Sequence, residues 1–189
     1  MTKRTAMAPA PAPMTLDEYL RTRETLLPQE LAFGALRVAD SPLPRHQQAV
    51  FAIARALDAH VRERHLGQVW TSPLDVILDE PLALVVQPDL FFVSHERASI
   101  ISDRVRGAPD LIVEVLSPRP RIGDLDQRVG WFARYGVREC WIYHQPERVL
   151  EILTLSGGGV LATSRLDERD PISSTVLPHF TLTTRDITG

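Results

Sequence analysis

The sequence predicts an α/β (α+β) fold in which helices flank a central mixed β-sheet within a single domain. Two observations favour this class. Short apolar segments of strand length alternate with longer segments of helical periodicity, and no internal repeat is present. A third observation is the length of 189 residues with 44% hydrophobic side chains, which suits one domain with a sizeable core.

The N-terminal region divides into a tail and a first helix. Residues 1–13 are rich in alanine and proline, which predicts a disordered tail before a folded domain at 14–189. Thr15 and Glu18 have the spacing of a capping box, so we expect a helix from about 16 to 26.

A hairpin and a long helix follow the first helix. Residues 31–38 contain two short strand patterns with Gly34 at the turn between them. Pro44 opens a helix that should run to about Leu66 and be closed by Gly67. The apolar face of this helix repeats at helical spacing, in Val50, Ile53, Leu57 and Val61.

The middle of the chain is predicted to be extended. Three segments have strand character, at 68–72, 74–78 and 85–93, and Pro88 should kink the third or place it at a sheet edge. A loop with a helical turn then leads to Gly107.

The C-terminal half contains the most apolar strand. Residues 110–116 are almost wholly apolar, which is typical of a strand buried on both faces. A helix at 124–135 follows, and strands are expected at 138–144 and 149–155, with a weaker strand after the glycine turn at 157–159. The apolar stripe of this helix is formed by Ile122, Leu125, Val129 and Phe132.

Composition limits the classes of function. The net charge of −3 argues against a broad nucleic-acid surface, although it allows a local basic loop. No apolar run is long enough for a membrane span, and the basic start lacks the apolar core of a signal peptide. The single Cys140 cannot form an intrachain disulfide, so we expect a cytoplasmic protein. Lys3 is the only lysine, which matters because arginine does not freely replace a lysine with a chemical role.

Glu114 is the first candidate for chemistry because it interrupts an apolar strand. A buried unpaired carboxylate is costly, so Glu114 either pairs with an arginine or serves a metal or catalytic site. Side chains alternate along a strand, so Asp110 and Glu114 share one face with Ile112 and could line the same cleft.

Asp89 is the second candidate. It follows Pro88 in an apolar segment, so it is either a turn aspartate or a carboxylate splayed out at an opening of the sheet. Asp89 and Glu114 on neighbouring strands would offer the hard oxygen ligands that Mg²⁺ or Mn²⁺ prefers. The sequence lacks zinc-site spacing, a phosphate-binding glycine loop and a nucleophilic serine elbow.

Arginines close to Glu114 in the chain have two interpretations. Asp124 and Arg128 are four residues apart on the predicted helix, which is the spacing of a surface ion pair, yet Arg128 could instead point towards the carboxylates. Arg119 and Arg121, in the loop before that helix, could contact a phosphate backbone or be merely solvated.

Several extended motifs run through most of the chain, from about 14 to 182. They are MTLDEYL, Glu30-Leu31 with Gly34, SPLPRHQQ, GQVWTSPLDVIL, VVQPDLFFVS, GAPDLIVEVLSP, ARYGVRECWIY and LPHFTL. With these motifs the sequence resembles the Uma-two-type family of restriction endonucleases, within the PD-(D/E)XK nuclease superfamily. The combination of QPDL, PDLIVEVLSP and the following GVRECW strand is the most specific part.

The resemblance implies a restriction-endonuclease-like fold, a divalent-metal site for Mg²⁺ or Mn²⁺, and hydrolysis of phosphodiester bonds. It makes Asp89 and Glu114 metal ligands and Glu30 an acidic residue of the N-terminal hairpin near the site. His46 matches a histidine at the start of a helix, which we expect to bind substrate. The supporting acids implied by the resemblance are Asp75, Asp110 and Asp124.

The chain departs from the family pattern in two places. In this family the lysine typical of the superfamily has moved to the helix after the Glu114 strand, where this chain has Arg128. Arginine stabilises phosphate charge well, but its high pKa prevents it from acting readily as a base. The hairpin has Phe33 and Ala35 where the family has acids, so it brings less negative charge to the site.

Three hypotheses follow. The first is a Mg²⁺-dependent endodeoxyribonuclease acting on DNA, with Asp89, Glu114, Arg128 and Glu30 as catalytic residues. The second is a degenerate nuclease fold that binds nucleic acid or a protein without cutting. The third is a structural domain in which every acid is paired, and an enclosed Glu114 capped by an arginine would favour it. Cutting both strands of a duplex often uses two sites, so the first hypothesis allows a homodimer.

Overall fold

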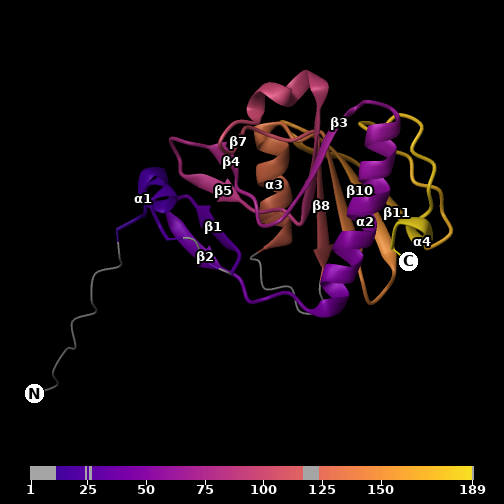
Figure 1. Ribbon diagram of the computed structural model, residues 1–189, viewed down its shortest axis with the longest axis horizontal. Coiled ribbons are helices and arrows are strands. Elements are labelled where there is room, and N and C mark those ends of the chain that lie inside the picture. Colours follow the sequence, from indigo (N-terminus) through magenta and orange to yellow (C-terminus); the bar gives the residue numbers. More distant parts are fainter. Residues whose placement is uncertain (1–11, 24, 26, 117–123, 189) are drawn as a thin grey trace, which may run out of the picture.

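The computed structural model describes residues 12–23, 25, 27–116 and 124–188 (Figure 1). Most of the predicted tail and the loop with Arg119 and Arg121 lie outside the described residues. The helices are α1 (Leu16–Leu20), α2 (Pro44–Glu63), α3 (Leu125–Tyr135), α4 (Thr184–Thr188) and the 3-10 helix η1 (His95–Ile100). No helix in the described ranges is long and apolar enough to cross a membrane.

The strands form two mixed sheets. The five-stranded sheet has the order β2-β1-β5-β4-β7 and contains β1 (Gln29–Ala32), β2 (Ala35–Val38), β4 (Val76–Asp79), β5 (Leu84–Val86) and β7 (Val105–Arg106). The six-stranded sheet has the order β11-β10-β9-β8-β6-β3 and contains β3 (Gly67–Thr71), β6 (Leu90–Ser94), β8 (Leu111–Leu116), β9 (Glu139–His144), β10 (Val149–Ser156) and β11 (Gly159–Leu166). The predicted α/β class is confirmed, but the single sheet that we expected is divided into two.

Helices α2 and α3 cover opposite faces of the six-stranded sheet, as Figure 1 shows on either side of β8. Successive side chains of a strand point to opposite faces. Accordingly, Val113 and Val115 pack in the core cluster that contains the buried face of α2, whereas Ile112 packs in the cluster that contains Phe132 of α3. The same alternation directs Glu114 towards α3, and the predicted burial of this strand on both faces is confirmed.

Pro88 divides the segment 85–93 into two strands that belong to different sheets. We predicted one strand, kinked at Pro88 or lying at a sheet edge, which is wrong: β5 pairs with β1 and β4, and β6 pairs with β3 and β8. Proline has no N–H to donate to a strand ladder, so the chain leaves one sheet at this residue and enters the other. Asp89 therefore lies at the junction of the two sheets, directly before β6.

The capping box that starts α1 is confirmed, but α1 ends at Leu20, earlier than expected. Thr15 Oγ1 accepts from the Glu18 N–H, and the Glu18 side chain accepts from the Thr15 N–H. The chain after Leu20 is polar, and the N–H of Arg21 closes the helix on Asp17 and Tyr19 carbonyls.

The end of α2 differs from the prediction for a backbone reason. The helix ends at Glu63, and His65 takes the left-handed conformation (φ 52°) usual for a capping glycine, while the Leu66 N–H donates to the Val61 carbonyl. Gly67 instead begins β3, where an added Cβ would lie 2.1 Å from the Val93 carbonyl oxygen. The prediction that Gly67 closes α2 is therefore wrong.

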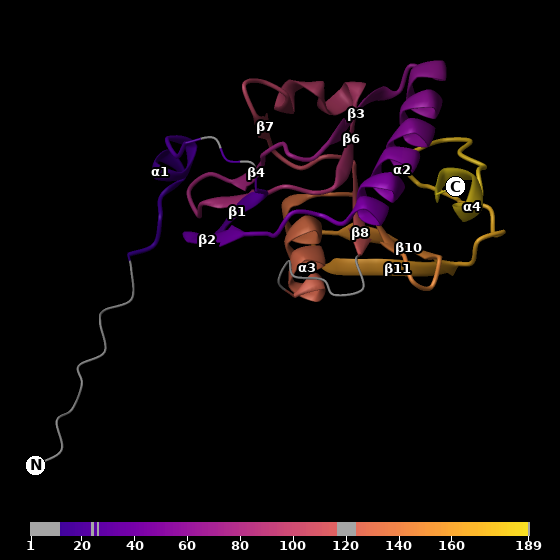
Figure 2. The same cartoon turned by 60° about the horizontal axis from the view of Figure 1, so that its bottom comes forward.

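The hairpin of β1 and β2 lies beside α3 (Figure 2). Its turn residues Phe33 and Gly34 both have positive φ, 51° and 83°, as type I′ hairpin turns require. The Phe33 ring meets the Trp131 ring of α3 edge-on at 5.5 Å between centroids, and Arg37 lies over the same indole. These contacts hold β1, and with it Glu30, against the helix that carries Arg128.

Candidate active site

Arg128 is the centre of a buried cluster of charged side chains. Its Nη1 donates to Glu30 Oε1 and Oε2 at 2.8 and 2.6 Å, and its Nη2 and Nε donate to Glu114 Oε1 at 2.7 and 3.2 Å. All three residues are buried, and Arg128 is only 2% exposed. The guanidinium therefore bridges two carboxylates that come from the two different sheets.

The local structure explains why Arg128 points inward. The Asp124 side chain caps α3 by accepting from the backbone N–H groups of Asp126 and Gln127, at 2.9 and 3.4 Å. Arg128 then follows in the second turn of α3, on the face that packs on the sheet. The interpretation of Asp124 and Arg128 as a surface ion pair is wrong, because the cap occupies the aspartate and the two sheet carboxylates occupy the arginine.

Asp89 lies beside Glu114 and is held by two other elements. Its Oδ2 accepts from the backbone N–H of Val115 at 2.8 Å and lies 3.2 Å from Nε2 of His46. His46 belongs to the first turn of α2, and Val115 directly follows Glu114 on β8. Asp89 is therefore anchored across the sheet and is not a locally bonded turn aspartate.

The cluster has more negative than positive charge. Three carboxylates, on Glu30, Asp89 and Glu114, face the single permanent positive charge of Arg128. Burial, together with Asp89 and Glu30, raises the pKa of Glu114 to about 7 against the lowering effect of Arg128. Burial alone would lower the pKa of His46, but Asp89 raises it above its usual value. The pKa of Arg128, which burial would lower, is raised by Glu114 and Glu30.

The carboxylate oxygens of Asp89 and Glu114 are the kind of ligand that a hard divalent cation prefers. Mg²⁺ usually takes one or two protein carboxylates and keeps several waters, and the surplus negative charge favours a cation. Within the described ranges, no group of three or more histidine, cysteine, aspartate or glutamate side chains is arranged to hold a metal. A site here would therefore rest on the Asp89–Glu114 pair completed by water.

Asp110 does not join this cluster, although it lies on the strand of Glu114. It precedes β8, where its Oδ2 accepts from the Ser94 N–H at 2.8 Å. Its Oδ1 lies 3.3 Å from Arg97 Nε and 3.1 Å from Arg138 Nη1. The expectation that Asp110 and Glu114 line one cleft fails because each is held at its own end of the strand.

Asp75 lies near the cluster and is connected to it through Gln87. Its Oδ1 accepts from Gln87 Nε2 at 2.8 Å, while the backbone N–H of Gln87 donates to Glu30 Oε1 at 2.8 Å. The Tyr19 hydroxyl donates to the same Asp75 oxygen at 2.9 Å. The sequence analysis did not single out Gln87 or Tyr19, although QPDL and MTLDEYL, the motifs that contain them, were recognised.

Glu139 is a buried acid that was not singled out from the sequence. It is fully buried at the start of β9, and it accepts from Trp141 Nε1 and from the Ser174 and Thr175 hydroxyls. The only signal in the sequence was a charged residue at the start of an apolar strand. Two of the donor residues, Ser174 and Thr175, lie 35 and 36 residues away on the C-terminal segment, so local pattern could not reveal them.

The mixed fold, with carboxylates from both sheets gathered at one place, agrees with the class of restriction-endonuclease-like proteins. The chain belongs to the Uma2 family, described as "putative restriction endonuclease", whose sequence profile matches residues 16–185. A crystal structure from Anabaena variabilis, described as "a putative nuclease belonging to DUF820", is similar with a TM-score of 0.78 and 18% identity. The similarity covers 93% of this chain and 98% of that chain. No curated protein matches the sequence.

Proposed function

We propose that this protein is a Mg²⁺- or Mn²⁺-dependent endonuclease that hydrolyses phosphodiester bonds of DNA, with Asp89 and Glu114 as the metal ligands. The observation that carries the proposal is the gathering of three carboxylates, on Glu30, Asp89 and Glu114, around one guanidinium where the two sheets meet. Membership of a family described as restriction endonucleases supports the reaction class. A bound divalent cation supplies Lewis-acid chemistry, polarising the phosphodiester and lowering the pKa of an attacking water.

Each residue of the cluster then has a separate part. Glu30 and Arg128 are joined by two hydrogen bonds, and Arg128 in turn fixes one oxygen of Glu114. Because Arg128 is 2% exposed and engaged by both acids, its part is to position the carboxylates, and direct contact with a phosphate would need it to leave them. His46 and the Val115 N–H fix the orientation of Asp89.

The test combines metal binding with cleavage. Purified wild type and an Asp89→Ala/Glu114→Ala double variant are titrated with Mn²⁺ and Mg²⁺ by calorimetry, and the same samples are incubated with supercoiled plasmid. We expect binding and nicking in the wild type and neither in the double variant. Asp58→Ala, which removes an exposed carboxylate paired with Arg62 on α2, is the matched control and should behave as wild type. Absence of metal binding in the wild type would contradict the site.

A second candidate function is favoured by the same arginine. Arg128 occupies an oxygen of Glu114 and cannot act readily as a base, as expected for a nuclease fold that binds nucleic acid without cutting it. This candidate predicts metal binding without nicking, and cutting that appears in Arg128→Lys. The purely structural alternative is favoured by Glu114, which is enclosed and capped by Arg128, but it is opposed by the family match and by the additional carboxylate of Asp89.

A further inference from the structure

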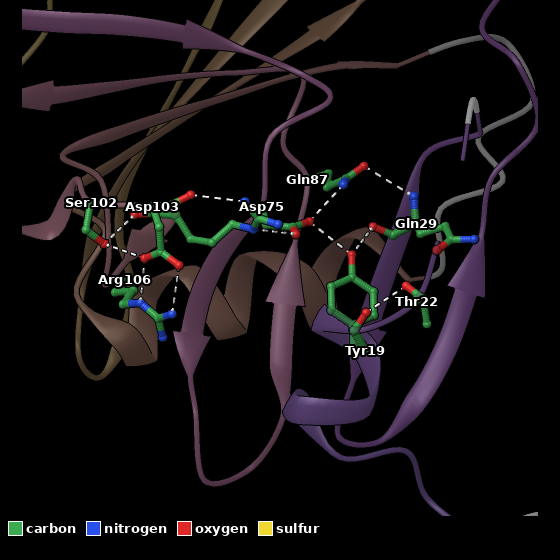
Figure 3. Close-up of polar contacts among 9 residues, drawn as sticks. Tyr19, Thr22, Gln29, Asp75, Gln87, Ser102, Asp103 and Arg106 are labelled. Atoms are coloured by element: carbon green, nitrogen blue, oxygen red, sulfur yellow. Dashed lines mark hydrogen bonds and ion pairs between the residues drawn. The ribbon is translucent and has the colours of Figure 1, made fainter. Parts of the chain in front are cut away.

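A cleft of about 460 Å³ lies on the side of the five-stranded sheet that faces α1. Its volume is within the range of sites for small molecules. Figure 3 shows Tyr19, Gln29, Asp75 and Gln87 joined by polar contacts at this place. Twelve residues line the cleft, and those that carry the argument are Tyr19, Arg23, Gln29, Asp75, Gln87 and Arg104.

The floor of the cleft is a fixed polar network. The Tyr19 hydroxyl lies 2.9 Å from Asp75 Oδ1 and 3.1 Å from the Gln29 carbonyl oxygen. The Gln87 side chain donates to Asp75 at 2.8 Å and accepts from the Gln29 N–H at 3.2 Å. Because these groups hydrogen-bond to one another, they are held in one arrangement, and the floor of the cleft is preorganised for a ligand.

Two arginines give the cleft a positive balance. Arg104 lies 3.6 Å from Asp75 Oδ2, and its Nε is buried without a hydrogen-bond partner in the described part of the chain. Arg23 is exposed and forms no ion pair with another described residue. With two guanidinium groups and one carboxylate, the cleft offers charged donors to an anion, and planar guanidinium groups suit phosphate in particular.

The cleft borders the carboxylate cluster through Gln87. The side chain of Gln87 faces Asp75 in the cleft, while its backbone N–H donates to Glu30. Asp89 follows two residues later, and its carbonyl accepts from Ser72, the neighbour of the lining residue Pro73. Gln87 therefore connects the cleft with the carboxylate cluster.

We propose that this cleft binds a single nucleotide of a nucleic-acid strand, with its phosphate against Arg23 and Arg104 and its sugar and base along the apolar wall. That wall is formed by Leu20, Leu27, Pro73 and Leu74. The inference rests on the proposed nuclease function and narrows its substrate, because the volume of the cleft suits one nucleotide. Strands with unpaired nucleotides are then the preferred substrates.

The test measures binding to the full chain in EDTA, which removes any contribution from divalent metal. A fluorescein-labelled oligothymidylate of eight nucleotides is titrated by anisotropy, and thymidine monophosphate by calorimetry. We expect Arg104→Ala and Arg23→Ala each to weaken binding of the oligonucleotide about tenfold, as for loss of a charge-assisted contact. Arg62→Ala, which removes an exposed arginine of α2, is the matched control and should bind as wild type. Arg23 makes no contact needed for the fold, so its variant remains informative if Arg104→Ala is unstable.

The outcomes separate this inference from the proposed function. Equal oligonucleotide binding by wild type and both cleft variants overturns the inference, even if the wild type nicks plasmid in Mn²⁺. If the wild type binds thymidine monophosphate but does not bind the oligonucleotide, the inference is also overturned, because the cleft would then serve a free nucleotide. Weakened oligonucleotide binding in both cleft variants supports the inference, even if no protein cuts DNA, in which case the proposed nuclease function fails alone.

Discussion

Two sets of buried acids lie at opposite ends of the paired strands β8 and β9. At the N-terminal end, Glu139 accepts four hydrogen bonds: its Oε1 from Trp141 and Ser174, and its Oε2 from the N–H and hydroxyl of Thr175. These donors are uncharged and all lie at 2.6 to 2.7 Å. Both oxygens of Glu139 are therefore saturated by the protein itself.

At the other end, the acids are crowded and share one arginine. Glu114 and Glu30 divide the donors of Arg128, and Asp89 adds a third carboxylate. The pKa of Glu114 is raised because burial and its acidic neighbours outweigh Arg128. The difference teaches that burial alone does not mark a functional acid. A carboxylate whose charge the protein leaves uncompensated is the better candidate for a cation site.

The largest expected difference between the two ends is in activity. Asp89→Asn keeps an oxygen for the Val115 N–H but removes a carboxylate charge, so we expect Mn²⁺-dependent plasmid nicking to fall by roughly 10²–10³-fold, as for loss of one electrostatic contact to a transition state. Glu139→Gln changes the saturated acid in the same way and should leave nicking within a few-fold of wild type. Equal losses in two folded variants would remove the functional distinction between the two ends.

The next effect is on stability, and here we expect the substitution at Glu139 to cost more than the substitution at Glu114. Glu139→Ala strands four buried donors, so we expect the free energy of unfolding to fall by about 3 kcal/mol or more. Glu114→Gln removes a charge that burial and neighbouring acids disfavour, so its effect should be close to zero or stabilising. Urea unfolding in EDTA measures both. Glu147→Ala, at an exposed ion pair with Arg165, is the surface control and should change stability little.

The residues at these two ends could be predicted from the sequence only where their positions follow from local patterns, and not where they depend on contacts between residues far apart in the chain. The strand of Glu114 and the helix of Arg128 were predictable because apolar runs and apolar periodicity are local signals. Asp89 was a candidate because it follows Pro88 in an apolar segment, whereas Glu30 was supplied only by the resemblance to a family. Glu139 could not be found, because its partners lie in an irregular C-terminal segment without a periodic pattern.

The division of the sheet was unpredictable for a similar reason. Pro88 predicted a kink, but which strands lie on either side of it depends on long-range pairing, here β5 with β1 and β6 with β8. The direction of Arg128 was left open between a surface pair and the carboxylates. Only the contact of α3 with both sheets decides it, because Asp124 is used by the helix cap.

A third effect distinguishes stabilisation of the carboxylates by Arg128 from their stabilisation by a bound metal. Arg128→Met leaves Glu30 and Glu114 without their buried partner, so in EDTA we expect a loss of about 3 kcal/mol in the free energy of unfolding. Excess Mn²⁺ should then raise the melting temperature of the variant more than that of wild type, because the variant has the larger surplus of negative charge. Arg128→Lys, which keeps the charge, is the control and should show a smaller loss and a smaller rescue. Equal shifts with Mn²⁺ in all three proteins would show that the cation binds elsewhere.

The smallest expected effect is the pH dependence of stability. Because the pKa of Glu114 is raised from 4.5 to about 7 in the fold, the native state binds its proton more tightly than the unfolded chain does. The contribution of this group is therefore present below pH 4.5 and is lost as the pH rises to about 7. Urea unfolding in EDTA at pH 5 and pH 8 should show wild type losing stability relative to Glu114→Gln as the pH rises.

The sign of this change in stability with pH tests whether Glu114 differs from Glu139 in having an unfavourable charge. If wild type instead gained stability relative to Glu114→Gln between pH 5 and pH 8, Arg128 would outweigh burial and the neighbouring acids. Glu114 would then be a compensated structural acid like Glu139, and Asp89 alone would remain to attract a cation. Asp58→Asn, on the exposed face of α2, should show no difference from wild type between the two pH values, so that the change can be assigned to the buried carboxylate.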